Sequence, residues 1–273
     1  MRKLLFMIIS LIASGATAQE IGLQLHSLRD QFKKDVPGTM KMVKSWNIKE
    51  VELAGTYGLT TEDFKKLLSE NNITIISTGA DFETLESNPQ AVAEEAKSLG
   101  AKYVVCFWIP HNGNDFTLED AQKAVKVFNT AGKVLKENGL SFCYHAHGFE
   151  FRSYQNKTLF DYLMDNMDTA YANFEMDVFW MKHPGQDPVA LLKKYPNRFQ
   201  LMHLKDRRPG TQGNQNGQAD VETNVVLGTG DVGIAAVMKV AKKAGVKHFF
   251  IEDESSRSET QVPLSLAYLR GLK

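Results

Sequence analysis

Apolar and polar positions along this chain repeat in a strand-then-helix order eight times. The strand-like runs are short and rich in β-branched and aromatic residues, and they cover residues 21–27, 49–54, 73–78, 102–108, 140–147, 171–177, 198–205 and 247–253. Between them, apolar residues recur every three or four positions, the spacing of amphipathic helices. Strands that alternate with helices in this way predict βαβ units on a parallel sheet.

The number of these units favours one architecture. Eight βα units in a chain of about 250 residues match the (β/α)8 barrel. A doubly wound sheet is the alternative, but no Gly-rich dinucleotide-binding loop follows the first run. We therefore expect an α/β fold, a single-domain (β/α)8 TIM barrel.

Local signals indicate where the helices begin and end. Pro37 and Pro89 suit the first turn of a helix, and Gly100 and Gly139 suit the position just past the last turn. Together with the apolar spacing, these signals predict helices over residues 37–46, 61–70, 89–99, 117–138, 232–244 and 258–270.

The first 18 residues have the pattern of a secretory signal peptide. Arg2 and Lys3 precede an apolar run, and Ala16-Thr17-Ala18 fits a small-x-small cleavage site. The apolar run is shorter than the roughly 20 residues of a membrane-spanning helix; a buried N-terminal helix is the alternative. We expect residues 1–18 to be removed, leaving the barrel domain in residues 19–273, exported to the periplasm or the extracellular space, without a membrane anchor.

Composition narrows the range of partners. The 273 residues contain 32 Lys and Arg against 32 Asp and Glu, a formal net charge of zero. Without a basic excess, nucleic acid is a poor candidate for the main ligand, and a small molecule is expected instead. Association into a homo-oligomer stays open. Cys106 and Cys143 lie in apolar runs, and we favour free buried thiols over a disulfide.

One connection interrupts the repeat. Residues 206–230 are rich in Gly, Gln and Asn and follow the seventh strand-like run. Loops of this length in compact domains are usually functional. Because the ends of barrel strands carry the active-site loops, we interpret this segment as a lid rather than an inert insertion.

Acidic residues and histidines occupy the ends of the last four runs. Glu150, Asp177, His203 and Glu252 follow one another at spacings of about one βα unit, except where the long loop intervenes. Each alone is typical of a cap, a turn or a satisfied core residue. Together, three carboxylates and one imidazole suit a divalent metal such as Mn²⁺, Co²⁺, Mg²⁺ or Zn²⁺.

These residues also carry a family resemblance. The stretch YHAHGFEF resembles the Tyr-His-Asn-His-x-x-Glu-Phe signature of the xylose-isomerase-like barrel superfamily, also called sugar phosphate isomerase/epimerase or endonuclease-IV-like. The blocks GLQLHSLRD, VELAG, MDVFW, LMHLKD, LGTGDV and IED are similar to other blocks of that family, in the same order. The resemblance implies a divalent metal held by Glu150, Asp177, His203 and Glu252.

Two positions depart from the family pattern. Many sugar epimerases of this superfamily have Glu where this chain has His145, so either Glu150 reaches the metal or His145 replaces it as a ligand. The usual first block has Tyr where this chain has His26, which alters the expected substrate pocket.

The expected chemistry is removal of a proton next to a ketone. His145 and His147 are the candidate bases, because imidazole titrates near neutral pH; Glu252 is counted with both the metal ligands and the acid/base groups. Lys205 either donates to a developing oxyanion or pairs with an acid. Four further residues near strand ends suit contacts with sugar hydroxyls or with the face of a sugar: Gln24, His26, Glu52 and Trp108. Trp108 is equally typical of a core aromatic residue.

The fate of the enolate would decide the reaction. Reprotonation gives epimerisation or isomerisation, whereas expulsion of a leaving group at the β carbon gives elimination. Predicted export favours a lyase that removes the aglycone of a 3-keto-glycoside. The alternatives are a keto-sugar isomerase or epimerase and a non-catalytic sugar-binding barrel. The nuclease branch of the superfamily is disfavoured, because it needs a His-rich multi-zinc site and a basic groove, whereas this chain has seven His and no basic excess.

Overall fold

A computed structural model describes residues 20–272. Eight parallel strands close into a barrel in the order β1-β12-β9-β8-β5-β4-β3-β2, so the predicted (β/α)8 fold is confirmed. The predicted strand-like runs contain the barrel strands β1 (Ile21–Gln24), β2 (Glu50–Glu52), β3 (Thr74–Gly79), β4 (Tyr103–Cys106), β5 (Ser141–His145), β8 (Ala172–Asp177), β9 (Phe199–Leu204) and β12 (His248–Ile251), β3 alone running one residue past its run.

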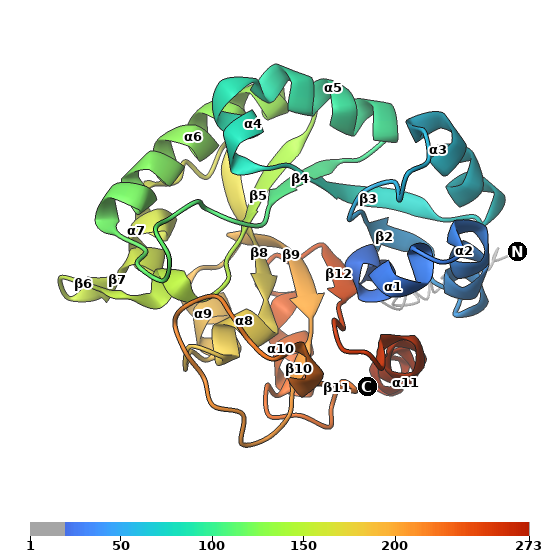
Figure 1. The fold of residues 1–273 in the computed structure, drawn as a ribbon. Helices are drawn as coiled ribbons and strands as arrows, with labels where there is room; N and C mark the ends of the chain where they lie inside the picture. Colours follow the sequence, from blue (N-terminus) through green and yellow to red (C-terminus); the bar gives the residue numbers. More distant parts are fainter. Residues whose placement is uncertain (1–19, 273) are drawn as a thin grey trace, which may run out of the picture.

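Helices surround this barrel (Figure 1). They are α1 (Arg29–Phe32), α2 (Val36–Ser45), α3 (Thr61–Glu70), α4 (Phe82–Ser87), α5 (Pro89–Leu99), α6 (Leu118–Glu137), α7 (Leu159–Asn166), α8 (Val178–Lys182), α9 (Pro188–Lys194), α10 (Ile234–Ala241) and α11 (Ser258–Gly271). The predicted helices are present, and α10 is shorter than expected. The sequence pattern missed α1, α4, α7, α8 and α9, which have four to eight residues; a segment of this length contains few repeats of the helical period.

Short elements decorate the ends of the strands. A hairpin of β6 (Ser153–Tyr154) and β7 (Lys157–Thr158) follows β5, and 3-10 turns cover η1 (Leu25–Leu28), η2 (Phe149–Phe151) and η3 (Val221–Thr223). The long connection after β9 contains η3 and the antiparallel pair β10 (Asp206–Arg207) and β11 (Asn224–Val225). It is therefore an ordered loop with its own hydrogen bonds.

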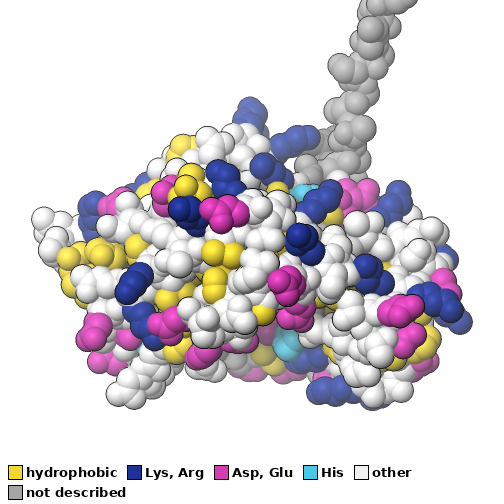
Figure 2. All heavy atoms as spheres, turned by 90° about the horizontal axis from the view of Figure 1, so that it is seen from above, with side chains coloured by type: hydrophobic (Ala, Val, Ile, Leu, Met, Phe, Trp, Pro, Cys, Tyr) yellow, Lys and Arg dark blue, Asp and Glu magenta, His cyan; other side chains and the backbone are white. Residues whose placement is uncertain are grey.

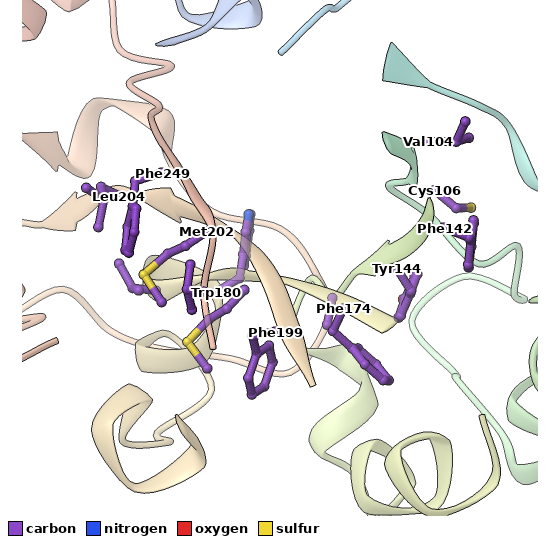
Figure 3. Close-up of a cluster of buried hydrophobic side chains, with 14 of the residues drawn as sticks. Val104, Cys106, Phe142, Tyr144, Phe174, Trp180, Phe199, Met202, Leu204 and Phe249 are labelled. Carbon is purple, nitrogen blue, oxygen red and sulfur yellow. The ribbon is translucent and has the colours of Figure 1, made fainter. Parts of the chain in front are cut away.

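Side-chain alternation along the strands separates two regions of the core. Residues facing outward pack beneath the helices, as the cluster that includes Tyr144, Phe174 and Met202 shows (Figure 3). Residues facing inward fill part of the barrel with a second apolar cluster: Ile76, Tyr103, Val105, Cys143, Leu201 and Phe250. Because successive side chains point to opposite faces of a strand, the next inward positions toward the strand ends carry the polar site.

The two cysteines lie on opposite faces of the barrel sheet. Cys106 belongs to the outer cluster and Cys143 to the inner one. Both are buried and free. The prediction of free core thiols is confirmed, and the period of two along a strand is the reason that neighbouring strands hold them apart.

A glycine in the longest helix provides a test of the packing. A Cβ at Gly132 of α6 would lie 2.4 Å from the backbone oxygen of Tyr171. Exposed helix glycines usually gain up to about 1 kcal/mol on replacement by alanine, but here the backbone has to move. We expect Gly132→Ala to lower the free energy of unfolding by about 1–3 kcal/mol. Denaturant titration measures this.

Gly271→Ala is the matched control, because no atom lies within 4 Å of the added Cβ at that position of α11. We expect it to change the free energy of unfolding by less than about 1 kcal/mol. A Gly132→Ala variant as stable as Gly271→Ala would contradict the close packing of α6 on the segment before β8.

Within residues 20–272, none of the helices combines the length and the apolar character needed to cross a membrane. The predicted signal peptide, residues 1–18, lies outside the described residues.

Candidate active site

A layer of polar side chains lies at the carboxyl ends of the barrel strands, directly beyond the inner apolar cluster. Its members all occupy inward positions: Gln24, Glu52, Ser77, His145, Glu175, Asp177, His203, Lys205 and Glu252, each at most 8% exposed. The parallel register places Asp177 beside His203, and His145 beside Glu175. The same period of two that fills the core therefore brings these groups together.

His203 lies at the centre of this layer. Its Nε2 is 2.6 Å from Glu52 Oε1 and 3.3 Å from Glu175 Oε2. Its Nδ1 is 3.2 Å from Glu252 Oε2 and 4.0 Å from Asp177 Oδ2. Glu52 is itself held by Gln24 and Ser77, whose side chains donate to its two oxygens over 2.6 and 2.5 Å.

His145 has a matching arrangement on β5. Its Nδ1 lies 2.9 Å from Glu175 Oε2, and its Nε2 lies 3.9 Å from Asp177 Oδ2. Glu175 thus contacts both His145 and His203, while Asp177 faces the other nitrogen of each ring. Asp177 Oδ1 also accepts hydrogen bonds from the backbone of Phe179 and Trp180 and caps α8.

Two groups of side chains have the spacing of metal ligands: His145, Asp177 and His203, and Glu52, Glu175 and His203. In the second group, His203 already hydrogen-bonds to Glu52 and forms an ion pair with Glu175. In the first, Asp177 Oδ2 lies 3.9–4.0 Å from both imidazoles. Two ligands with bonds of about 2.1 Å lie at most about 4.2 Å apart. Glu175 and Glu52 then occupy the positions of carboxylates that orient metal-bound histidines.

Burial and mutual repulsion perturb the acids of this layer. Burial raises the pKa of Asp177 to about 7. It also raises the pKa of Glu175 well above its usual value, and the nearby charge of Glu52 adds to the shift. Burial acts to lower the pKa of His203, but the surrounding carboxylates outweigh it and hold that pKa well above normal.

The donor set fits a divalent cation. Four buried carboxylates, those of Glu52, Glu175, Asp177 and Glu252, face one buried lysine, Lys205. Among the described residues, Asp177 Oδ2 and Glu175 Oε1 are buried without a hydrogen-bond partner. Buried charges without compensation are costly, so a cation beside His145, Asp177 and His203, with Glu252 at the edge, would relieve both the repulsion and the missing bond of Asp177.

The structure does not bring Glu150 into either group. This residue lies on η2, beyond the end of β5, where Gly148 turns the chain with a φ of 92°. Its carboxylate accepts hydrogen bonds from the Tyr144 hydroxyl and, over 3.1 Å, from the backbone N–H of His147. Asp177, His203 and Glu252 therefore lie together, and of the two residues that the sequence left as alternatives, His145 faces Asp177 and Glu150 does not.

Lys205 forms ion pairs both with acids of this layer and with Glu254 at the cavity wall. Its Nζ lies 3.1 Å from Glu252 Oε2, 2.5 Å from Glu254 Oε2 and 3.9 Å from Asp177 Oδ2. Burial acts to lower its pKa, but these acids outweigh it and raise the pKa above its usual value. The lysine is therefore a fixed cation. Glu254 also approaches His26, with Oε1 3.6 Å from Nε2.

A cavity of about 1170 Å³ opens above this layer. Most of the predicted site residues line it: Gln24, His26, Trp108, His145, His147, Lys205 and Glu252. Glu52 lies beneath and is fully buried. From the long loop after β9, residues 217–219 and Val221 also line the cavity, which places that loop at the mouth of the site as expected.

His147 lies beside His145 and lines the cavity. Its ring centroid is 4.7 Å from that of His145 and 5.3 Å from that of Trp180. Burial, together with the charge of Lys205, lowers its pKa to about 4. The imidazole is therefore neutral at pH 7, the form that can accept a proton.

Sequence reasoning missed several contributors to the site. Glu175 and Ser77 orient other side chains, Glu254 pairs with Lys205, and Trp180 lines the cavity. Glu175 could have been predicted from the sequence, because it lies two residues before Asp177 and therefore on the same face of β8.

Fold and site together define a TIM-barrel protein with a buried acid–histidine centre that could hold a divalent cation beneath a large cavity. Residues 40–272 match the model of the xylose isomerase-like TIM barrel family, and the chain belongs to that family.

Known proteins resemble this chain to different degrees in sequence and in structure. Inosose dehydratase of Bacillus anthracis is 30% identical over 176 residues, which is 58% of this chain and 58% of the relative. A sugar phosphate isomerase/epimerase from Parabacteroides distasonis superposes with a TM-score of 0.75 at 25% identity, covering 93% of this chain and 100% of that one. The IOLI protein, whose crystal structure holds a zinc atom, shares the fold with a TM-score of 0.70 at 12% identity and coverages of 92% and 95%.

Proposed function

We propose that this protein is a metal-dependent enzyme that removes the proton next to the carbonyl of a keto-sugar and then eliminates the group at the β carbon. Its substrate is a 3-keto-glycoside, whose aglycone is the leaving group. The observation that carries the proposal is the buried group of His145, Asp177 and His203 at the floor of a sugar-sized or larger cavity.

A divalent cation held by His145, Asp177, His203 and Glu252 would polarise the ketone and stabilise the charge that develops on its oxygen. The protein supplies the rest. Glu175 and Glu52 hold the two histidine rings through their outer nitrogens. The Lys205 ammonium at the cavity wall adds a fixed positive charge near the developing oxyanion.

His147 is the proposed base. Both ring nitrogens of His145 face carboxylates, whereas the ring of His147 lines the cavity and pairs with no carboxylate among the described residues. His147 takes the proton from C2 of the 3-keto-glycoside. The electron pair left on C2 forms the C1=C2 bond and the C1–O bond breaks. The aglycone oxygen takes up a proton, from the now protonated His147 or from water, and the aglycone leaves as an alcohol.

Support for elimination comes from the curated relatives. They are named as dehydratases, and loss of water is itself an elimination. Because the matched segment spans only 58% of those relatives, the activity is a proposal for this chain. Predicted export also favours glycosides, and we propose action outside the cytoplasm.

A second candidate is isomerisation or epimerisation of a keto-sugar without cleavage. It shares the proton abstraction and is favoured by the likeness to the Parabacteroides isomerase/epimerase. The two differ only in whether a leaving group departs.

The test is proton NMR of the metal-loaded protein with a 3-keto-glucoside in D₂O, with and without a chelator. We expect loss of the C2 proton signal together with release of the aglycone, and suppression of both by the chelator. Exchange without release would replace elimination by the isomerase or epimerase reading. No exchange with any keto-glycoside or free ketose would overturn the enzyme proposal in favour of a binding protein.

A further inference from the structure

The cavity is larger than one sugar ring requires. Its volume of about 1170 Å³ exceeds the roughly 300–1,000 Å³ of pockets that enclose drug-sized ligands. The centre described above lies at its floor, where His145, Lys205 and Glu252 are exposed to it. A monosaccharide placed at that centre leaves the outer part of the cavity free for further substrate.

Trp108 forms one wall of this outer part. It is 37% exposed, and in residues 20–272 Leu264 is the other exposed large apolar side chain. A Trp at the mouth of a polar cavity exposes apolar surface that a bound ring can cover. The indole is not loosely held, because the His111 ring stacks on it at 5.1 Å and the Phe149 ring packs edge-on at 4.9 Å.

A row of rings leads from the centre to Trp108. The centroid spacing is 4.7 Å from His203 to His145, 4.7 Å from His145 to His147, and 5.5 Å from His147 to Trp108. Trp108 is therefore one ring beyond the proposed base. A substrate ring beside His147 would place the ring attached through its leaving oxygen next to Trp108.

The long loop adjoins Trp108 and lines the neighbouring side of this outer part. Gly217 approaches the indole so closely that a Cβ would lie 3.0 Å from Trp108 Cη2. Gln218 and Ala219 of the same loop line the cavity. Asparagine side chains brace the turn, since Asn214 Oδ1 accepts from the N–H of Asn216 and Asn216 Oδ1 accepts from the N–H of Gln218. Trp108 and residues 217–219 thus meet and form two adjoining sides, one apolar and one polar, of the outer part of the cavity, which we call the slot.

We propose that this slot binds the leaving group of the substrate and that it selects leaving groups that are themselves rings, either a second sugar or an aromatic group. The proposal rests on the proposed function for the identity of the leaving group. Trp108 is the specificity-determining residue, and its role is in binding rather than in proton transfer.

The test compares metal-loaded wild type with Trp108→Ala and Trp108→Phe on 3-keto-glucosides that carry a methyl, a phenyl or a glucosyl leaving group. We expect Trp108→Ala to lower kcat/KM for the phenyl and glucosyl substrates by about tenfold to a hundredfold and to leave the methyl substrate within about twofold. Trp108→Phe should restore part of the loss. The larger of the two losses tells which ring the slot prefers.

Leu264→Ala is the matched control, because it also removes an exposed large apolar side chain, one that does not line the cavity. It should leave all three substrates unchanged. Equal losses on methyl and ring-bearing substrates in Trp108→Ala, or no loss on any, would overturn the slot.

Calorimetric binding of the parent glycosides, which lack the ketone and cannot react, separates this proposal from the proposed function. Tighter binding of the phenyl or glucosyl compound than of the methyl compound, lost in Trp108→Ala, supports the slot even if no keto-glycoside turns over. If neither turnover nor binding depends on the leaving group, the result supports the enzyme activity and overturns the slot.

Discussion

Asp177→Ala should lose its bound metal and its turnover while the barrel remains folded. Asp177 Oδ2 faces both His145 and His203 and is buried without a hydrogen-bond partner among the described residues. Removing an outer carboxylate that orients a ligand already costs about 10- to 100-fold in metal affinity, so loss of this ligand should cost more. Metal analysis after gel filtration and the D₂O assay measure the two effects.

Asp177→Asn refines the same experiment. Asp177 Oδ1 caps α8, and loss of a cap costs about 1 kcal/mol of stability. The alanine variant therefore loses both the cap and the metal ligand. Asparagine can keep the cap and removes the charge. We expect it to lose metal as alanine does, with a smaller change in melting temperature.

Glu150→Gln is the control for this prediction, since Glu150 is a buried acid near the site that belongs to neither ligand group. Its metal content should equal that of the wild type. Metal retained by Asp177→Ala and by His203→Ala would refute the ligand set, and metal lost from Glu150→Gln would restore the assignment made from the sequence.

His147→Ala should keep the metal and lose turnover by about 10²- to 10⁴-fold, the usual contribution of a general base. The ring lines the cavity and lies outside both metal-ligand groups. Metal content and the rate of C2 proton exchange in D₂O give the two readouts, which a purely structural residue would not separate in this way.

His145→Ala is the matched variant, the same residue type two positions earlier on the same strand. Because its two nitrogens face Glu175 and Asp177, we expect it to lose metal as well as turnover. If His145→Ala keeps its metal and loses only exchange, while His147→Ala remains active, then His145 is the base and His147 has neither role.

The absence of a basic groove on the face that Figure 2 shows agrees with the zero net charge. Basic and acidic side chains are interspersed there and do not separate into regions of one sign. A surface of mixed charge offers a phosphate backbone no continuous counter-charge on that face.

Much of the candidate site followed from strand position. Asp177, His203 and Glu252 lie on inward positions at or just past the ends of β8, β9 and β12, and the barrel brings these ends together. Glu150 did not follow, because it lies past the strand on a turn whose direction depends on Gly148 and on packing against its neighbours. Alternation along a strand is a local property, whereas the path of a turn is not.

The sequence by itself determined the barrel, its strands, the free cysteines and the edge at which polar groups would gather. These depend on periodicity, which short-range sterics and burial dictate. Only the tertiary structure decided that His145 rather than Glu150 faces Asp177, that Glu175 orients both histidines, and that Gly217 lies against Trp108. These depend on distances between residues that are 27 (Glu150 and Asp177) to 109 (Trp108 and Gly217) positions apart, and local patterns do not determine such distances.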